Sequence, residues 1–480
     1  MLIRDAEVAG RRVDLRCTGG QIAAIATGLA PTRDEPVIDA AGGALLAGLH
    51  DHHLHLFSLA AALVSVDCGP PAVRNATALA RALAEAPRSD GWRRGVAYHE
   101  SVAGPLDRIR LDALAPDGPV RIQHRSGIAW HLNSAALAAL GLDGPLAEPD
   151  RDGDLPRIER DAAGHATGRL FRADAWLRRR LPMAAAPDLG AAASRLARFG
   201  ITGFTDATPT NDLAQAERFR AAQRDGSLPQ RVVLMGDASL AALEPDARLS
   251  VGARKFLLDE PALPDLDALV DAIRVAHDQG RGAAFHCVTR VEIQFALAAL
   301  ATTGTNGRDR IEHASVAPPE AIDRARRLGA RVVTQPAFVL ERGDDYLRDV
   351  EPRDRPHLYR LRSWLEAGVP LAAGTDAPYG QPDPWRALAA ATRRRTRAGR
   401  PLGPNEAIEP ETALGLFSSD RATPCDPLAL RVGMPADLCL LDRPWRAARD
   451  APSADSVAAT LCAGRVVHAR NDAPGARVPA

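Results

Sequence analysis

Eight short apolar segments alternate with amphipathic segments rich in alanine and arginine along most of this chain of 480 residues. A strand pattern that alternates with a helix pattern predicts a parallel β-sheet with helical crossovers. Eight repeats are the number found in a (β/α)₈ barrel, an α/β fold of the TIM type. The predicted strands run through or end at His53, Asp206, Gly236, Lys255, His286, His313, Gln335 and Asp376.

The two ends of the chain carry a different pattern. Residues 1–46 and 426–480 alternate apolar and polar residues between turns, as in L-I-R-D-A-E-V and V-G-M-P-A-D-L-C-L-L-D. Short strands of this kind are too few at either end to close a core alone. We therefore expect the termini to form one small composite β-sandwich, with the barrel inserted between them at residues 47–425.

One connection is far too long for a simple crossover. Residues 64–195 separate the first two predicted barrel strands and contain strand and helix patterns of their own. A long insertion after a barrel strand is expected over the C-terminal face, where active sites form. We interpret this insertion as a lid subdomain that shapes a substrate pocket.

The composition argues against several kinds of partner. Sixty basic and sixty acidic side chains cancel, which gives no electrostatic basis for binding nucleic acid or an anionic membrane. The six cysteines show no paired spacing and fit reduced thiols in a cytoplasmic protein better than a disulfide framework. The first residues lack the apolar core of a signal peptide, and no apolar run approaches membrane-spanning length. We expect a cytoplasmic protein.

A histidine cluster marks the first barrel strand, in the stretch A-G-L-H-D-H-H-L-H-L at residues 47–56. Alternate side chains of a strand share a face, so His53 and His55 would point the same way. Two imidazoles with Asp51 close by make half of a site for zinc or a similar ion. By itself this stretch also fits a histidine-rich turn after an apolar strand, so the later strands must supply the remaining ligands.

The chain contains a single lysine, Lys255, among sixty basic residues. Arginine stays charged in proteins, whereas a buried lysine can lose its proton and act as a nucleophile. A requirement for an amine at this position explains the exception, and drift in an arginine-rich lineage explains it equally well until its surroundings are known.

Polar residues interrupt the apolar strands at the positions where a barrel points side chains into its mouth. One such histidine is more often a satisfied core residue than a ligand. A whole set, each on a separately predicted strand end, favours a metal site instead. The set comprises His53, His55, Lys255, His286, His313 and Asp376.

These motifs resemble the amidohydrolase superfamily, and in particular the amidohydrolase family 3 branch that includes N-substituted formamide deformylase-like proteins. The resemblance rests on G-L-H-D-H-H-L-H, A-F-H, R-I-E-H-A and G-T-D-A-P-Y-G-Q-P-D-P-W-R. The stretches W-H-L-N-S-A-A-L and G-I-T-G-F-T-D support it further. It covers essentially the whole chain. It implies a hydrolase that cleaves a C–N bond other than a peptide bond, in an amide, formamide, carbamate or cyclic amide of a small molecule, through a metal-bound hydroxide.

The resemblance also implies the roles of the polar set. His53, His55 and Asp376 would hold one Zn²⁺, and His286 and His313 would hold a second. Lys255, carboxylated on its amine, would bridge the two ions. Asp376 would also be the catalytic group, taking a proton from the attacking hydroxide and passing it to the leaving nitrogen.

The chain departs from the family pattern at Ile128, where a histidine is usual in S-G-H-A-W, and this puts the substrate contacts in doubt. Candidate substrate contacts are Tyr98, Glu100, Arg125, Trp130, His131 and Gln335. Two alternatives stay open: a mononuclear deaminase on the same barrel, and a catalytically dead scaffold. A homodimer also stays open.

Overall fold

The computed structural model describes residues 1–144, 157–181, 187–418 and 429–470, and it divides into two compact units. The first unit contains residues 1–56 and 189–480, and the second contains residues 57–188. The predicted boundary between residues 425 and 426 lies outside the described residues. We predicted the insertion at residues 64–195, and each boundary of the second unit lies seven residues earlier in the chain.

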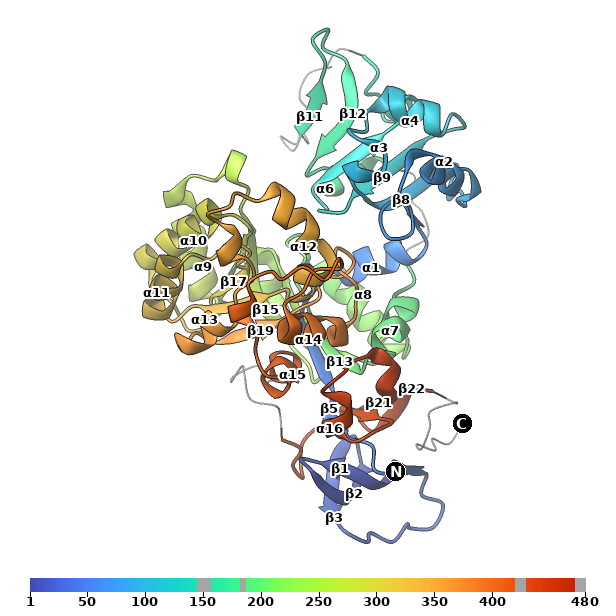
Figure 1. Ribbon diagram of the computed structural model, residues 1–480, viewed down its shortest axis with the longest axis vertical. Coiled ribbons are helices and arrows are strands. Elements are labelled where there is room, and N and C mark those ends of the chain that lie inside the picture. The colour runs from blue at the N-terminus through green and yellow to red at the C-terminus, as the bar shows by residue number, and fades with distance from the viewer. Residues whose placement is uncertain (145–156, 182–186, 419–428, 471–480) are drawn as a thin grey trace. The chain divides into compact units, whose positions relative to one another are not determined.

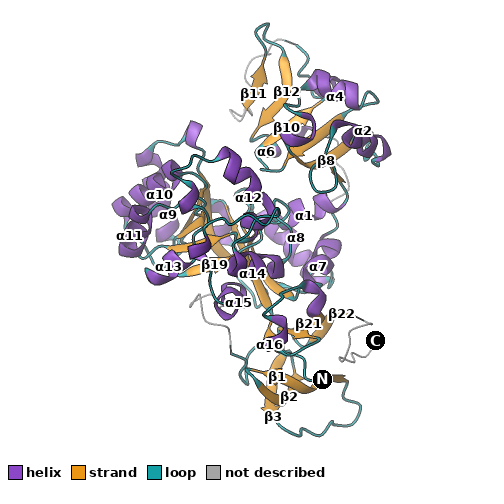
Figure 2. Ribbon diagram, viewed as in Figure 1, coloured by secondary structure: helices purple, strands orange, loops and turns teal. Residues whose placement is uncertain are grey.

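The first unit is built on the predicted barrel (Figures 1 and 2). Eight parallel strands form one sheet in the order β19-β18-β17-β16-β15-β14-β13-β6, so neighbours in sequence are neighbours in space once the insertion is left out. The strands are β6 (Leu49–Leu54), β13 (Ile201–Asp206), β14 (Arg231–Gly236), β15 (Leu249–Leu257), β16 (Ala283–Cys287), β17 (Arg310–His313), β18 (Arg331–Thr334) and β19 (Leu371–Ala373).

Amphipathic helices surround these strands (Figure 2). In α11, for example, Ala321, Ile322 and Ala325 are buried on one face, and Gly329 ends the helix with a left-handed φ of 72°. The helices are α7 (Leu189–Ala197), α8 (Leu213–Arg224), α9 (Leu266–Asp278), α10 (Arg290–Thr303), α11 (Pro319–Leu328), α12 (Ala337–Asp349), α13 (Arg362–Glu366), α14 (Pro384–Arg393) and α15 (Pro410–Ser418).

Two four-stranded sheets from opposite ends of the chain pack together through one apolar core (Figure 1). The first strands contribute Ile3, Leu15 and Ile22 to this core, and the last strands contribute Leu440 and Leu461. The sheets have the orders β3-β2-β1-β4 and β22-β21-β20-β5. Their strands are β1 (Leu2–Val8), β2 (Arg11–Thr18), β3 (Gln21–Ala26), β4 (Val37–Asp39), β5 (Leu45–Ala47), β20 (Leu438–Leu441), β21 (Val457–Cys462) and β22 (Arg465–Ala469).

The second unit has its own six-stranded sheet, in the order β11-β12-β10-β9-β8-β7, and its own apolar cores. Its strands are β7 (Val66–Asp67), β8 (Arg93–Tyr98), β9 (Val120–His124), β10 (Ala129–Leu132), β11 (Arg157–Arg160) and β12 (Ala166–Phe171), and its helices are α2 (Ala76–Glu85), α3 (Glu100–Ala103), α4 (Arg108–Leu114), α5 (Ser134–Ala139) and α6 (Asp174–Arg180). In the part of the chain that the structure describes, no helix is long and apolar enough to cross a membrane.

Candidate metal centre

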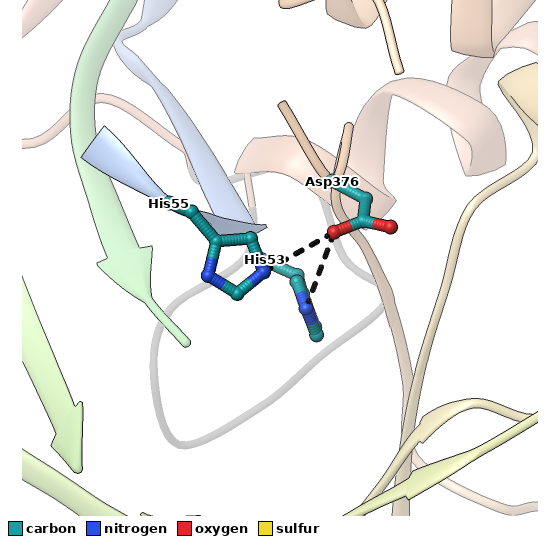
Figure 3. Close-up of side chains that lie close together, drawn as sticks. All are labelled: His53, His55 and Asp376. Atoms are coloured by element: carbon teal, nitrogen blue, oxygen red, sulfur yellow. Dashed lines mark ion pairs between the residues drawn. The ribbon is translucent and has the colours of Figure 1, made fainter. Parts of the chain in front are cut away.

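Two histidines and one carboxylate converge at the end of the first and last barrel strands (Figure 3). Asp376 Oδ1 lies 3.6 Å from His53 Nε2 and 3.3 Å from His55 Nε2. One donor atom from each residue lies within 4.8 Å of the others, as metal binding requires. Two imidazoles and a carboxylate are a ligand set that zinc accepts. Within the described ranges this is the only such group of three His, Cys, Asp or Glu donors.

Backbone contacts between the first and last barrel strands create this convergence. The Asp376 amide donates to the His53 carbonyl at 2.8 Å, and the His55 amide donates to the Ala377 carbonyl at 2.8 Å. Gly374 permits the close approach, since a Cβ atom there would lie 2.5 Å from His53 Cβ. The sheet is therefore closed by hydrogen bonds at the place where the donors meet.

Two of the candidate ligands have a left-handed backbone. His313 has φ 67° and Asp376 has φ 57°. Residues with a Cβ rarely adopt this region, and non-glycine residues that do so cluster at functional sites. In both cases the side chain leaves the strand end at an angle that an extended backbone would not give.

A buried carboxylate orients His53. Glu312 Oε2 lies 2.5 Å from His53 Nδ1, and Arg310 donates to both oxygens of the same carboxylate at 2.7 and 3.1 Å. With Nδ1 donating to Glu312, the lone pair of His53 Nε2 faces Asp376, where a metal would bind. This role was not predicted from the sequence, although Glu312 is an acidic residue in the predicted barrel strand R-I-E-H.

The electrostatics keep these groups in the forms that bind metals. Burial lowers the pKa of His53 to about 3, which leaves the imidazole neutral. Burial by itself would raise the pKa of Asp376, but the hydrogen bond from His55 and the nearby His313 and His53 outweigh it and hold this pKa below its usual range. Neutral imidazoles and an ionised carboxylate are the ligating forms of these groups.

The other candidate histidines are also held in place. His55 Nδ1 lies 2.8 Å from Thr208 Oγ1, and His313 Nδ1 lies 2.8 Å from Gln335 Oε1. We predicted Gln335 as a substrate contact, and the structure places its amide oxygen on His313. The ring centroid of His286 lies 4.5 Å from that of His313, which in turn lies 4.7 Å from that of His53. The four strand-end histidines thus form a continuous group.

Lys255 lies in the same buried region. Its side-chain nitrogen is buried and has no hydrogen-bond partner among the described residues. Burial lowers the pKa of this amine to about 8, even though Glu312 and Asp376 favour the charged form. A buried amine without a hydrogen-bond partner lowers the stability of the folded state unless a further group binds to it.

Asp51, which the sequence placed near the metal site, has a structural role instead. Its carboxylate accepts hydrogen bonds from the Thr375 amide at 3.0 Å, the Thr375 hydroxyl at 2.5 Å and the His53 amide at 3.1 Å. These bonds join the first strand to the loop after the last one. Asp51 therefore supports the site without being part of the donor group.

Two predicted substrate contacts are packing residues of the second unit. Tyr98 is fully buried in an apolar core, and its hydroxyl donates to the Gly104 carbonyl at 2.6 Å. Trp130 is buried in a second core, and its indole N–H donates to Asp174 at 3.1 Å. Core packing accounts for the size of both side chains, and their assignment as substrate contacts stays a prediction.

The other predicted substrate contacts in this unit are polar side chains, and they differ in how far they are buried. The Glu100 side chain is 48% exposed and lies 3.2 Å from His124 Nε2, and Arg125 is half-buried and directly follows His124, the last residue of β9. His131 is buried, with Nδ1 2.7 Å from the Leu106 carbonyl oxygen. The assignment of Glu100 and Arg125 as substrate contacts therefore stays a prediction, while His131 is part of the interior.

Comparisons with known proteins agree with this geometry. A family model described as amidohydrolase family matches residues 36–468. The chain is 27% identical to N-substituted formamide deformylase of Arthrobacter pascens, with 89% of each protein covered. It is 26% identical to the putative amidohydrolase YtcJ of Bacillus subtilis (strain 168), over 79% of this chain and 80% of that protein.

Two solved structures share the fold. An uncharacterized metal-dependent hydrolase from Pyrococcus horikoshii matches with a TM-score of 0.72 and 19% identity, over 92% of this chain and 97% of that one. Atrazine chlorohydrolase TrzN from Arthrobacter aurescens, crystallised with zinc, matches with a TM-score of 0.55 and 15% identity, over 97% and 94% of the two chains. At these identities the likeness concerns the fold alone.

Proposed function

The chain belongs to the amidohydrolase family, and on this premise we propose that it is a metal-dependent hydrolase that cleaves a C–N bond of a small molecule. The bond is that of an amide, formamide, carbamate or cyclic amide. The observation that carries the proposal is the donor group His53, His55 and Asp376, with the buried amine of Lys255 in the same polar region.

The residues present fit a divalent metal, zinc in the first place. His53, His55 and Asp376 would hold one ion, and His286 and His313 would hold a second, with Lys255 between them. When bound, such ions supply Lewis acidity, which activates water and polarises a carbonyl at neutral pH. The unpaired amine of Lys255 supports the two-ion arrangement, because a lone buried lysine contributes nothing to packing that an apolar residue would not.

Lys255 would act as a carbamate. Its neutral amine attacks carbon dioxide, a C–N bond forms, one C–O π bond breaks, and the amine proton leaves to solvent. The product is an anionic carboxylate on a long stem, which can reach two cations. A pKa lowered to about 8 supports this step, since it leaves a useful fraction of free amine near neutral pH.

Asp376 would move the proton. Its carboxylate is ionised and lies against His53 and His55, so it can accept a proton from the attacking water and return it to the departing nitrogen. Glu312 and Gln335 would act through the ligands, by fixing the ring orientations of His53 and His313.

Metal content and turnover test this proposal together. The purified chain is analysed for metal per chain and then assayed against a panel of N-formyl, N-acyl, carbamoyl and cyclic amide compounds. About two metal ions per chain with C–N hydrolysis supports the proposal. One ion per chain supports the mononuclear alternative, and no metal with no turnover supports the scaffold alternative.

A further inference from the structure

A cavity of about 680 Å³ is lined by residues of six barrel strands. Ser250 of β15, Arg310 of β17 and Arg331 of β18 lie at the starts of their strands, and Thr205 of β13 and Met235 of β14 lie nearer the ends of theirs. The candidate ligands lie at the ends of the same strands, and none of them lines this cavity. The two sets of residues are therefore distinct, although Arg310 of the cavity bonds the carboxylate that orients His53.

The lining of this cavity is strongly cationic. It contains four arginines and two histidines, and no aspartate or glutamate is among the lining residues. The six are Arg281, Arg308, Arg310, Arg331, His50 and His52. A concave surface with charges of one sign focuses the field and raises the local concentration of counter-ions.

Arg281 is held by backbone carbonyls rather than by a carboxylate side chain. Its guanidinium is buried and donates to backbone carbonyls, those of Gly252 at 3.1 Å, Asp237 at 2.6 Å and Ala253 at 3.2 Å. Burial and the neighbouring Arg254 lower the pKa of Arg281 to about 10. Carbonyl groups carry no net charge and so do not cancel the charge of Arg281, whereas the charge of Asp237 favours the cation.

The positive charges of the other arginines repel one another. Burial lowers the pKa of Arg331, and the charges of Arg310 and Arg308 lower it further. Arg310 has a carboxylate partner in Glu312, while the Arg308 guanidinium donates to the Gly280 carbonyl. Arg308 is exposed and Arg331 is half-buried. An anion between them would relieve this repulsion.

We propose that this cavity binds a phosphate group, either free or as part of a small phosphorylated molecule. Guanidinium groups match the geometry of phosphate oxygens and bond them in pairs. The volume exceeds the needs of one phosphate ion and leaves room for an organic part. This proposal is independent of the hydrolase function.

Calorimetric titration of the metal-loaded full chain tests the site, with inorganic phosphate and glycerol 3-phosphate as probes and sodium chloride of matched ionic strength as the blank. Arg308→Gln and Arg331→Gln each remove one charge, and each should weaken binding roughly tenfold, as the loss of one charged hydrogen-bond donor predicts. Arg331→Lys keeps the charge but loses the paired bonds, so its affinity should lie between those of the wild type and Arg331→Gln. Arg310 is left unchanged, because it holds Glu312.

Arg327→Gln is the matched control, since Arg327 is an exposed arginine of α11 outside the cavity. Tighter binding of glycerol 3-phosphate than of phosphate assigns the site to a phosphorylated metabolite, and the reverse assigns it to the free ion. Equal binding by the wild type, Arg308→Gln and Arg331→Gln overturns the proposal, because the anion would then bind at the metals or nowhere specific. If Arg331→Gln fails to fold, Arg308→Gln still tests the phosphate site, because Arg308 is an exposed residue.

Discussion

His53 Nδ1 lies 2.5 Å from Glu312 Oε2, although 259 positions separate the two residues in the chain. Glu312 is fully buried and also accepts both hydrogen bonds from Arg310. Burial by itself would raise the pKa of this carboxyl, but Arg310, Lys255 and His53 hold it well below its usual range. One ionised carboxylate thus fixes the ring of a candidate metal ligand.

Glu312→Gln tests this relationship. The variant keeps the shape of the side chain but loses the charge that accepts the His53 Nδ1 proton. We expect metal affinity to fall about 10- to 100-fold, the usual cost of losing a hydrogen bond to a ligand. Competition with a chelator measures this affinity. Glu406→Gln is the control, because Glu406 is a buried carboxylate paired with Arg360 outside the site. An equal loss in both variants would point to general destabilisation.

Lys255→Ala should lose most activity and part of the bound metal, since no carbamate can form. Short carboxylic acids added to this variant should restore part of the rate by occupying the same place. Lys255→Arg should stay inactive with or without them, because a guanidinium remains cationic. The neighbouring Arg254→Ala, which alters the opposite face of β15, is the control.

The single lysine also allows a direct spectroscopic test. Wild-type protein equilibrated with ¹³C-labelled bicarbonate should show one lysine carbamate signal, and this signal should be missing from Lys255→Ala. Full activity, full metal content and no carbamate signal in the wild type would contradict the assignment of Lys255.

Asp376→Asn separates metal binding from proton transfer. The amide keeps an oxygen and nearly the same shape but cannot accept a proton. We expect most metal to remain bound by the histidines, with the rate lowered 10²- to 10⁴-fold, as is typical for loss of a general acid–base group. Metal analysis and kcat measure the two effects, and Asp349→Asn on the exposed end of α12 is the control. A near-normal kcat would show that another group transfers the proton.

His131 should make stability of the second unit depend on pH. Burial lowers its pKa to about 4, below the ordinary value of 6.5. The unfolded chain therefore binds one more proton between these values, so stability is full above pH 6.5 and falls as the pH drops towards 4. One proton corresponds to about 1.4 kcal/mol per pH unit.

Limited proteolysis of the full chain at pH 7 and pH 5 measures this effect through the rate of cleavage within residues 57–188. His131→Gln has no proton to bind at this position, so its susceptibility should change less between the two pH values than that of the wild type. His165→Gln, at an exposed position of the same unit, should behave as the wild type does. An identical pH response in wild type and His131→Gln would show that other groups carry it.

The sequence by itself determined the barrel and the residues of its candidate centre. The period of apolar residues is a local property, so each strand and helix could be predicted from its own segment. His53, His55, Lys255, His286, His313 and Asp376 were recognisable because each interrupts an apolar strand near its end. The order of strands then placed these ends at one mouth, since parallel strands point the same way.

Only the tertiary structure decided which of these groups touch, and through which atoms. The bond between His53 and Glu312 and that between His313 and Gln335 depend on the register of strands far apart in sequence. Tyr98 and Trp130 look like pocket residues in the sequence, yet the cores of the second unit enclose both. The left-handed backbone of His313 and Asp376 has no local signal either, because residues with a Cβ adopt it only when surrounding packing compels them. Contacts across the fold, rather than patterns along the chain, therefore turn a set of polar residues into a site.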